Sequence, residues 1–183
     1  MTAAGEEYRR RADAFERLIA GTPPDRWDSP SPCADWTASG VVEHVVSFTG
    51  YMLGEHARIG DAPAFADFAS PLDAFRATRR VMERVLDDPD APNDTVVQLQ
   101  WGPGFDLPVH CWDLAMATGQ DATMAPEDVD AYWGTGDPDG FEQAFGWQRD
   151  KGWYAQAVSV PDDAPIQDRL LGRLGRDPHW TAS

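Results

Sequence analysis

Apolar stripes with the spacing of an α-helix constrain this chain more than any other feature. In four segments, apolar residues recur every three or four positions, which places them on one helix face. The segments are 6–20, 38–56, 71–86 and 106–118. Thr37 and Ser70 stand where helix N-caps are expected, and Gly21 and Gly119 stand where helices end. We therefore predict a mainly α protein built on three to four long helices.

The rest of the chain carries weaker signals for shorter elements. These are a strand over 95–101, helices over 126–133 and 138–151, a strand over 155–161 and a helix over 163–174. We find no internal repeat and no low-complexity tract. The sequence thus predicts one domain over 1–183, with a short C-terminal α/β extension at about 155–180.

Charge and composition limit the kinds of partner that this protein can have. Fifteen basic and 31 acidic residues give a formal net charge of −16, which repels phosphate backbones and anionic lipids. The sequence has no apolar run of the ~18 residues needed to cross a membrane, and its start has no secretory apolar region. We expect a cytoplasmic protein that acts on a small molecule rather than on nucleic acid or membrane. A homodimer is one option for its oligomeric state.

The two cysteines, Cys33 and Cys111, are too few for a disulfide framework and too far apart for a CxxC motif. We expect both to be reduced, with the packing role of small buried hydrophobes. His56 and His179 fall at a helix end and in the tail, where we expect them to be exposed.

Three residues have the chemistry and spacing of metal ligands. Asp106 and His110 are four positions apart, so they share one helix face, and His44 interrupts a run of valines on another predicted helix. Two imidazoles and one carboxylate suit zinc or a similar divalent ion and leave a coordination position open. The alternatives are a satisfied core role for His44 and a helix-capping role for Asp106.

Three segments also resemble a known family. They are PCADWTASGVVEHVV at 32–46, PVHCWDLAMATGQ at 108–120 and VPDDAPIQDRLLGRLGRDPHW at 160–180. They are similar to actinobacterial-type metal-binding proteins of the DinB and mycothiol-dependent maleylpyruvate isomerase superfamily. The resemblance covers most of the chain and implies a DinB-like four-helix bundle. It also implies a divalent ion, with zinc expected, held by His44, Asp106 and His110.

The same resemblance implies a metal-dependent transferase or isomerase that brings a low-molecular-weight thiol such as mycothiol to a small electrophile. Two alternatives stay open: a binding or scaffold protein with a weakened metal site, and a biosynthetic cyclase or rearrangement enzyme with an aromatic pocket. The eight tryptophans serve packing or such a pocket.

This chain departs from the family pattern at the site itself. The family usually has glutamate where Asp106 stands, and Pro108 lies between the two ligands of this segment. A proline here requires the helix to begin at about Phe105. Asp113 is a further candidate, either as an alternative ligand or as an acceptor for an imidazole N–H. Glu43 is expected to point into solvent.

Overall fold

The computed structural model describes residues 2–133, 146–152 and 154–182. The chain divides into two compact units, Met1–Ala122 and Thr123–Ser183. The extension that the sequence predicted at about 155–180 lies within the second unit. Among the described residues the regular structure is helical, and the only β-type pairing is an isolated bridge between Pro30 and Thr37. No described helix has the length and apolar character needed to cross a bilayer.

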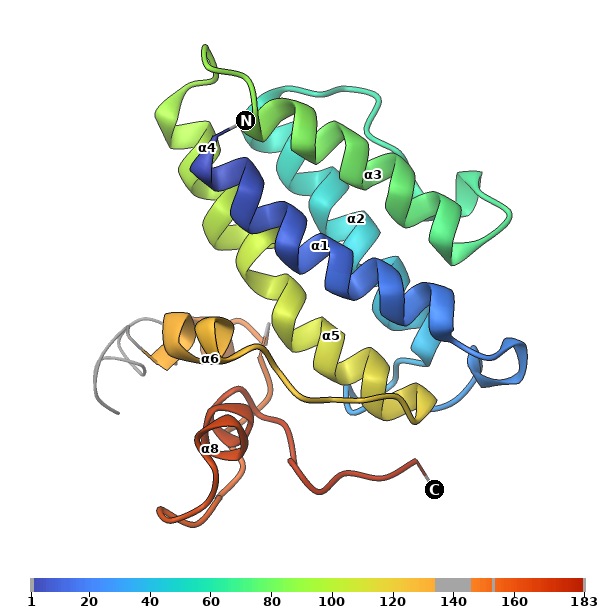
Figure 1. Cartoon of the computed structure of the whole chain (residues 1–183), viewed down its shortest axis with the longest axis vertical. Helices are drawn as coiled ribbons and strands as arrows, with labels where there is room; N and C mark the ends of the chain where they lie inside the picture. Colours follow the sequence, from blue (N-terminus) through green and yellow to red (C-terminus); the bar gives the residue numbers. More distant parts are fainter. Residues whose placement is uncertain (1, 134–145, 153, 183) are drawn as a thin grey trace. The chain divides into compact units, whose positions relative to one another are not determined.

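The first unit is a bundle of four long helices (Figure 1). They are α1 (Ala3–Gly21), α2 (Ala38–Ala57), α3 (Pro71–Leu86) and α5 (Phe105–Thr118). Helices α1 and α2 each pack against both α3 and α5. The four predicted segments match these helices closely, and the prediction of a mainly α bundle is confirmed.

Side-chain caps explain where these helices begin. Thr2, Thr37 and Ser70 each accept a hydrogen bond at 3.1 Å from the main-chain N–H three residues later. Each such cap satisfies an otherwise unpaired N–H and is worth about 1 kcal/mol. Helix α5 ends at Gly119, whose φ of 71° is the left-handed conformation that glycine adopts without strain.

The bundle core is formed by the apolar stripes that the sequence predicted. Phe15 of α1 meets Phe75 of α3 edge to face, with ring centroids 5.1 Å apart. Val42, Leu53 and Met82 are completely buried beside them. Burial of side chains this large contributes roughly 1.5 to 3 kcal/mol each, so the core provides most of the stability that holds the site.

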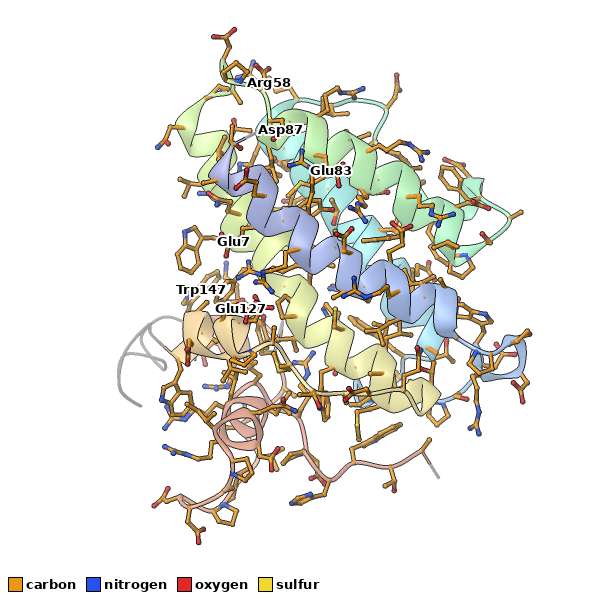
Figure 2. The ribbon with its side chains drawn as sticks, viewed as in Figure 1. Glu7, Arg58, Glu83, Asp87, Glu127 and Trp147 are labelled. Carbon is orange, nitrogen blue, oxygen red and sulfur yellow. The ribbon has the colours of Figure 1, made fainter. Side chains whose placement is uncertain are left out.

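Charged side chains add a second connection between α1 and α3. Arg9 pairs with Asp87 and lies 3.9 Å from Glu83, both toward the end of α3 (Figure 2). The main-chain N–H of Thr2 donates to Asp87 at 3.2 Å. This hydrogen bond, with the neighbouring Arg9, holds the pKa of the Asp87 carboxyl below its usual value, against a smaller opposing effect of desolvation.

The strand predicted over 95–101 is wrong, because this segment is helical. Helix α4 (Asn93–Leu99) continues into a π-helical turn, η3 (Gln100–Gly104), which leads directly into α5. Thr95 and Leu99 are buried four positions apart, which is a helical period rather than an alternating one. Gly102 departs from helical geometry and marks the kink between α4 and α5.

The second unit contains α6 (Pro126–Trp133), a helical stretch over 146–150 and α8 (Ile166–Arg173). Much of the helix predicted over 138–151 lies outside the described residues. The strand predicted over 155–161 is wrong, so the α/β extension is not found. The N–H of Val158 donates to the carbonyl of Gly172, in α8, at 2.8 Å. This partner belongs to a helix and not to a strand, so the extended segment forms no sheet.

Candidate metal centre

The start of α5 positions two of the three predicted ligands. The helix begins at Phe105, as the sequence predicted, so Pro108 lies near its first turn. Because proline has no N–H, it cannot donate to the carbonyl of Gly104 four residues earlier. The buried Arg11 of α1 donates to this carbonyl instead, at 3.1 Å. The helix therefore tolerates Pro108, and Asp106 keeps its place one turn before His110.

The structure brings His44, Asp106 and His110 together. Asp106 Oδ2 lies 3.0 Å from Nε2 of His110 and 3.4 Å from Nε2 of His44. One ligand atom from each residue lies within 4.8 Å of the others. The His110 side chain is 4% exposed, whereas those of Asp106 and His44 are 17% and 31% exposed. The cluster is thus anchored in the bundle at His110 and open to solvent at His44.

Aromatic rings surround the exposed imidazole. The ring of Trp36 lies over His44 with centroids 4.5 Å apart, and the ring of Phe48 stacks on it at 5.8 Å and 11°. Trp36 comes from the loop before α2, and its ring is also 6.0 Å from that of His110. These contacts restrict the rotation of His44 and shield the cluster with apolar surface.

The cluster has strongly coupled electrostatics. Burial raises the pKa of the Asp106 carboxyl, but the charge of His110 and hydrogen bonds from both imidazoles outweigh it and hold that pKa well below its usual range. Burial lowers the pKa of His110, but the Asp106 charge and hydrogen bonds with Asp106 and Asp113 raise it well above its usual value. An ionised carboxylate and a protonated imidazole therefore form an ion pair near neutral pH.

These donors fit a divalent metal ion. Protein zinc sites of the catalytic type use three nitrogen or oxygen ligands and leave a further position for a solvent or substrate atom. The set found here, two imidazole nitrogens and one carboxylate oxygen, matches that type. Because metal ligands bind in their deprotonated forms, an ion held by these three residues would replace the protons on their ligand atoms.

Asp113 lies on the other side of His110. Its Oδ2 is 2.9 Å from Nδ1 of His110, and its side chain is completely buried. Of the two roles that the sequence left open, this position favours the acceptor of an imidazole N–H. The same oxygen is 3.2 Å from Sγ of Cys33. The sequence analysis assigned Cys33 only a packing role and missed this contact, which joins residues 80 positions apart.

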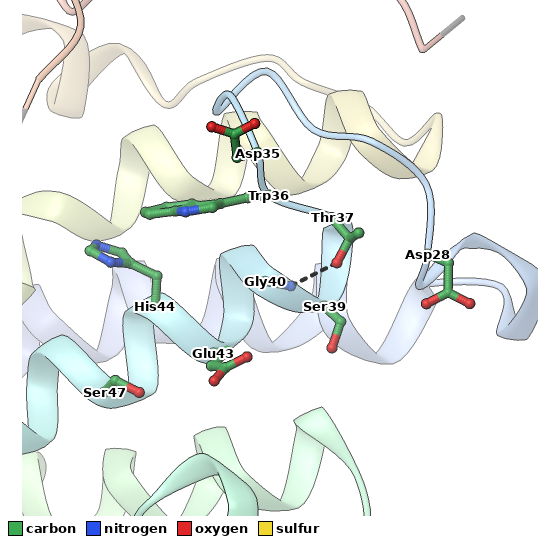
Figure 3. Close-up of a pocket in the computed structure, with 9 residues that line it drawn as sticks. All are labelled: Asp28, Asp35, Trp36, Thr37, Ser39, Gly40, Glu43, His44 and Ser47. Atoms are coloured by element: carbon green, nitrogen blue, oxygen red, sulfur yellow. Dashed lines mark hydrogen bonds between the residues drawn. The ribbon is translucent and has the colours of Figure 1, made fainter.

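A surface pocket of about 610 Å³ opens beside His44 (Figure 3). Its walls come from the loop before α2 and from the first turns of α2. They are lined by Asp28, Asp35, Trp36, Thr37, Ser39, Gly40, Glu43, His44 and Ser47. In Figure 3 the Trp36 ring lies above the His44 imidazole. Glu43 is exposed, as predicted, but it contributes to this wall. The pocket thus has three carboxylates and no basic side chain except His44.

The other residues that the sequence singled out were the two cysteines and His56. Neither Cys33 nor Cys111 forms a disulfide. They are half-buried rather than fully buried, so the packing role expected for both is only partly met. His56 is half-buried at the end of α2, and its carbonyl accepts a hydrogen bond from Thr95 at 2.9 Å.

Comparison with known proteins identifies the family. The family described as "Mycothiol maleylpyruvate isomerase N-terminal domain" matches residues 8–115. Two uncharacterized proteins of Mycobacterium tuberculosis, from strains CDC 1551 / Oshkosh and ATCC 25618 / H37Rv, are each 31% identical over 129 residues, covering 66% of this chain and 70% of theirs. No solved structure matches the chain significantly. Because the match covers more than half of the chain, with most of the bundle and all three clustered residues, the chain belongs to the mycothiol maleylpyruvate isomerase N-terminal domain family, a DinB-like group.

Proposed function

We propose that this protein is a metal-dependent enzyme that brings a low-molecular-weight thiol to a small electrophile, as a thiol transferase or a thiol-assisted isomerase. His44, Asp106 and His110 would hold the ion, with zinc expected, and mycothiol is the thiol that the family description suggests. The observation that carries the proposal is the convergence of three ligand atoms within 4.8 Å, from two helices of the bundle.

A divalent ion at this position would stabilise a thiolate near neutral pH. The residues of the chain supply the remaining functions. Asp113 accepts the Nδ1 proton of His110 and so directs Nε2 toward Asp106 and His44. The rings of Trp36 and Phe48 both pack on the His44 ring and restrict its orientation.

The pocket beside His44 is the expected entry for the substrate. Asp28, Asp35 and Glu43 make it electronegative. Such walls favour a neutral or cationic compound and disfavour an organic dianion. Trp36 offers a flat apolar surface on which a planar group can stack. We infer that the substrate is a neutral or cationic electrophile with an apolar or planar part.

Metal content and thiol-dependent turnover test the proposal. Protein purified from metal-replete medium is expected to contain about one divalent ion per chain, and His44→Ala is expected to lose it. His56→Ala, on the same helix but away from the cluster, is the matched control and should keep the ion. The loaded wild type should consume an electrophile only when thiol is present.

The outcome also separates the alternatives. A wild type without metal, in which His44→Ala changes nothing, contradicts the proposal and favours the binding or scaffold protein. A loaded protein that converts a substrate without thiol favours the cyclase or rearrangement enzyme, for which the Trp36 surface of the pocket is the supporting observation.

A further inference from the structure

A thiol lies on the side of His110 that faces away from the other two clustered residues. Cys33 belongs to the loop between η1 (Pro24–Arg26) and α2, and its Sγ lies 3.2 Å from Oδ2 of Asp113. Cys33, His110 and Asp113 each offer one ligand atom within 4.8 Å of the others. The thiol also interacts with His110 directly. Cys33 is therefore part of the surroundings of His110, although it is 80 positions from Asp113 in the sequence.

The hydrogen bonds around Asp113 have a definite direction. An ionised carboxylate only accepts, so the 2.9 Å contact requires a proton on Nδ1 of His110. The thiol then donates its S–H to the same oxygen. Asp113 is completely buried, and a buried carboxylate is costly unless each of its oxygens has donors. Cys33 supplies one of these donors at the place where Asp113 meets His110.

The loop around Cys33 is itself well fixed. The Cys33 carbonyl accepts hydrogen bonds from the Ser31 hydroxyl at 3.2 Å and from the main-chain N–H of Trp36 at 3.1 Å. The thiol contact therefore joins α5, which carries Asp106 and His110, to the loop whose Trp36 ring covers His44. One side chain connects the inner side of the cluster with the pocket wall.

We propose that Cys33 is a positioning residue of the metal centre, whose S–H holds Asp113 against Nδ1 of His110 and fastens the Trp36 loop to α5. This inference rests on the proposed function, because it assigns Cys33 a role toward the same ion. Cys33 does not bind the ion, since its Sγ lies on the Nδ1 side of His110 and the clustered atoms of His44 and Asp106 lie on the Nε2 side.

Three variants test the proposal by metal affinity. Cys33→Ala removes the donor, Cys33→Ser keeps a donor of similar size, and Cys111→Ser is the control for thiol loss on α5. In competition titrations with Zn²⁺, Cys33→Ala is expected to weaken binding about 10-fold, the lower end of the range for loss of an outer partner. Cys33→Ser should restore most of the affinity, and Cys111→Ser should bind like the wild type.

A second readout needs no metal. In chelator-treated protein, NMR of the imidazole N–H groups should show an Nδ1 proton of His110 that exchanges slowly with solvent. This exchange should become faster in Cys33→Ala and stay slow in Cys33→Ser. Circular dichroism checks that each variant is folded. If Cys33→Ala does not fold, the exchange rate of the His110 Nδ1 proton in the wild type and in Cys33→Ser tests the proposal instead.

Two results would overturn the inference. One is a Cys33→Ala variant in which both the Zn²⁺ affinity and the exchange rate of the His110 Nδ1 proton are unchanged. The other is fast exchange of this proton in the wild type. A sulfur-to-cobalt charge-transfer band in the Co²⁺-loaded wild type that Cys33→Ala abolishes would make Cys33 a ligand instead. A wild type that binds no Zn²⁺ contradicts the proposed function, and the Nδ1 exchange experiment still tests the contact between Cys33, Asp113 and His110.

Discussion

The guanidinium of Arg11 donates to the carbonyl of Gly104 at 3.1 Å, the hydrogen bond that Pro108 is unable to make. Arg11 is buried, and the second amino nitrogen of its guanidinium, Nη2, pairs with Glu7 at 2.8 Å. Its guanidinium carbon also lies 5.7 Å from the centre of the Phe105 ring. One side chain of α1 therefore satisfies the backbone at the point where α5 begins, two residues before Asp106.

Replacing Arg11 should loosen this end of α5. In Arg11→Met the Gly104 carbonyl loses its donor, and a buried carbonyl without a partner costs about 1–3 kcal/mol. We expect the free energy of unfolding to fall by that amount in urea titrations, and Zn²⁺ affinity to fall with it. Arg17→Met, at an exposed position of the same helix, is the control. Equal stability of the two variants would show that the contact does not support α5.

The Asp106 carboxylate should matter more for metal than for folding. Asp106→Ala is expected to weaken Zn²⁺ binding by more than the ~10–100-fold typical of outer partners and to abolish turnover. Asp106→Glu restores the reach usual in the family and should keep the ion. Asp90→Ala removes an exposed carboxylate of the same unit and should change neither property. Undiminished Zn²⁺ affinity in Asp106→Ala would remove this residue from the site.

The ion pair of Asp106 and His110 predicts how stability of the metal-free protein depends on pH. Because the pKa of Asp106 is lowered in the folded protein, its carboxylate contributes stability that is fully present above about pH 4. This contribution is lost as the pH falls toward the pKa of Asp106 in the folded protein. The raised pKa of His110 gives stability that is present below ~6.5 and is lost as pH rises through its folded-state value. The pair therefore stabilises the fold most between about pH 4 and 6.5.

Thermal midpoints measured with chelator present check this dependence. The difference between the wild type and Asp106→Asn should be largest in that interval and should shrink toward both ends. A difference that stays constant from pH 3, ~1 unit below the ordinary pKa of an aspartate, to pH 9, ~2.5 units above that of a histidine, would contradict the assigned ion pair.

The long helices could be predicted because their signals are local. The predicted segment 71–86 coincides with α3, and 38–56 differs from α2 by one residue. Their caps and apolar periods lie within a few residues of each other, so no tertiary information is needed. The pair of Asp106 and His110 was predictable for the same reason, because a spacing of four fixes a shared helix face.

The errors and omissions depend on contacts between distant segments. The run at 95–101 contains β-branched residues, yet packing of Thr95 and Leu99 in the bundle selects a helix. Arg11 and Gly104 are 93 positions apart, and Cys33 and Asp113 are 80 positions apart. No local pattern reports such contacts, since they form only when the loop before α2 and the helices are packed.

The charge of the pocket gives a prediction about anions. In the metal-loaded protein, an organic dicarboxylate should bind weakly, because Asp28, Asp35 and Glu43 repel it at the entry beside His44. These carboxylates are exposed, so dissolved salt screens their charge. The weak binding of the dicarboxylate should therefore strengthen as ionic strength rises toward ~0.15 M, where the Debye length is about 8 Å.

The variant Asp35→Asn/Glu43→Gln should bind the dicarboxylate several-fold more tightly at low salt and show less dependence on salt. Isothermal titration calorimetry measures both effects, and Glu55→Gln, at an exposed position farther along α2, serves as the control. Tight dicarboxylate binding by the wild type at low salt, unaffected by the double substitution, would show that the ion dominates the field of the pocket and that its carboxylates do not select the substrate.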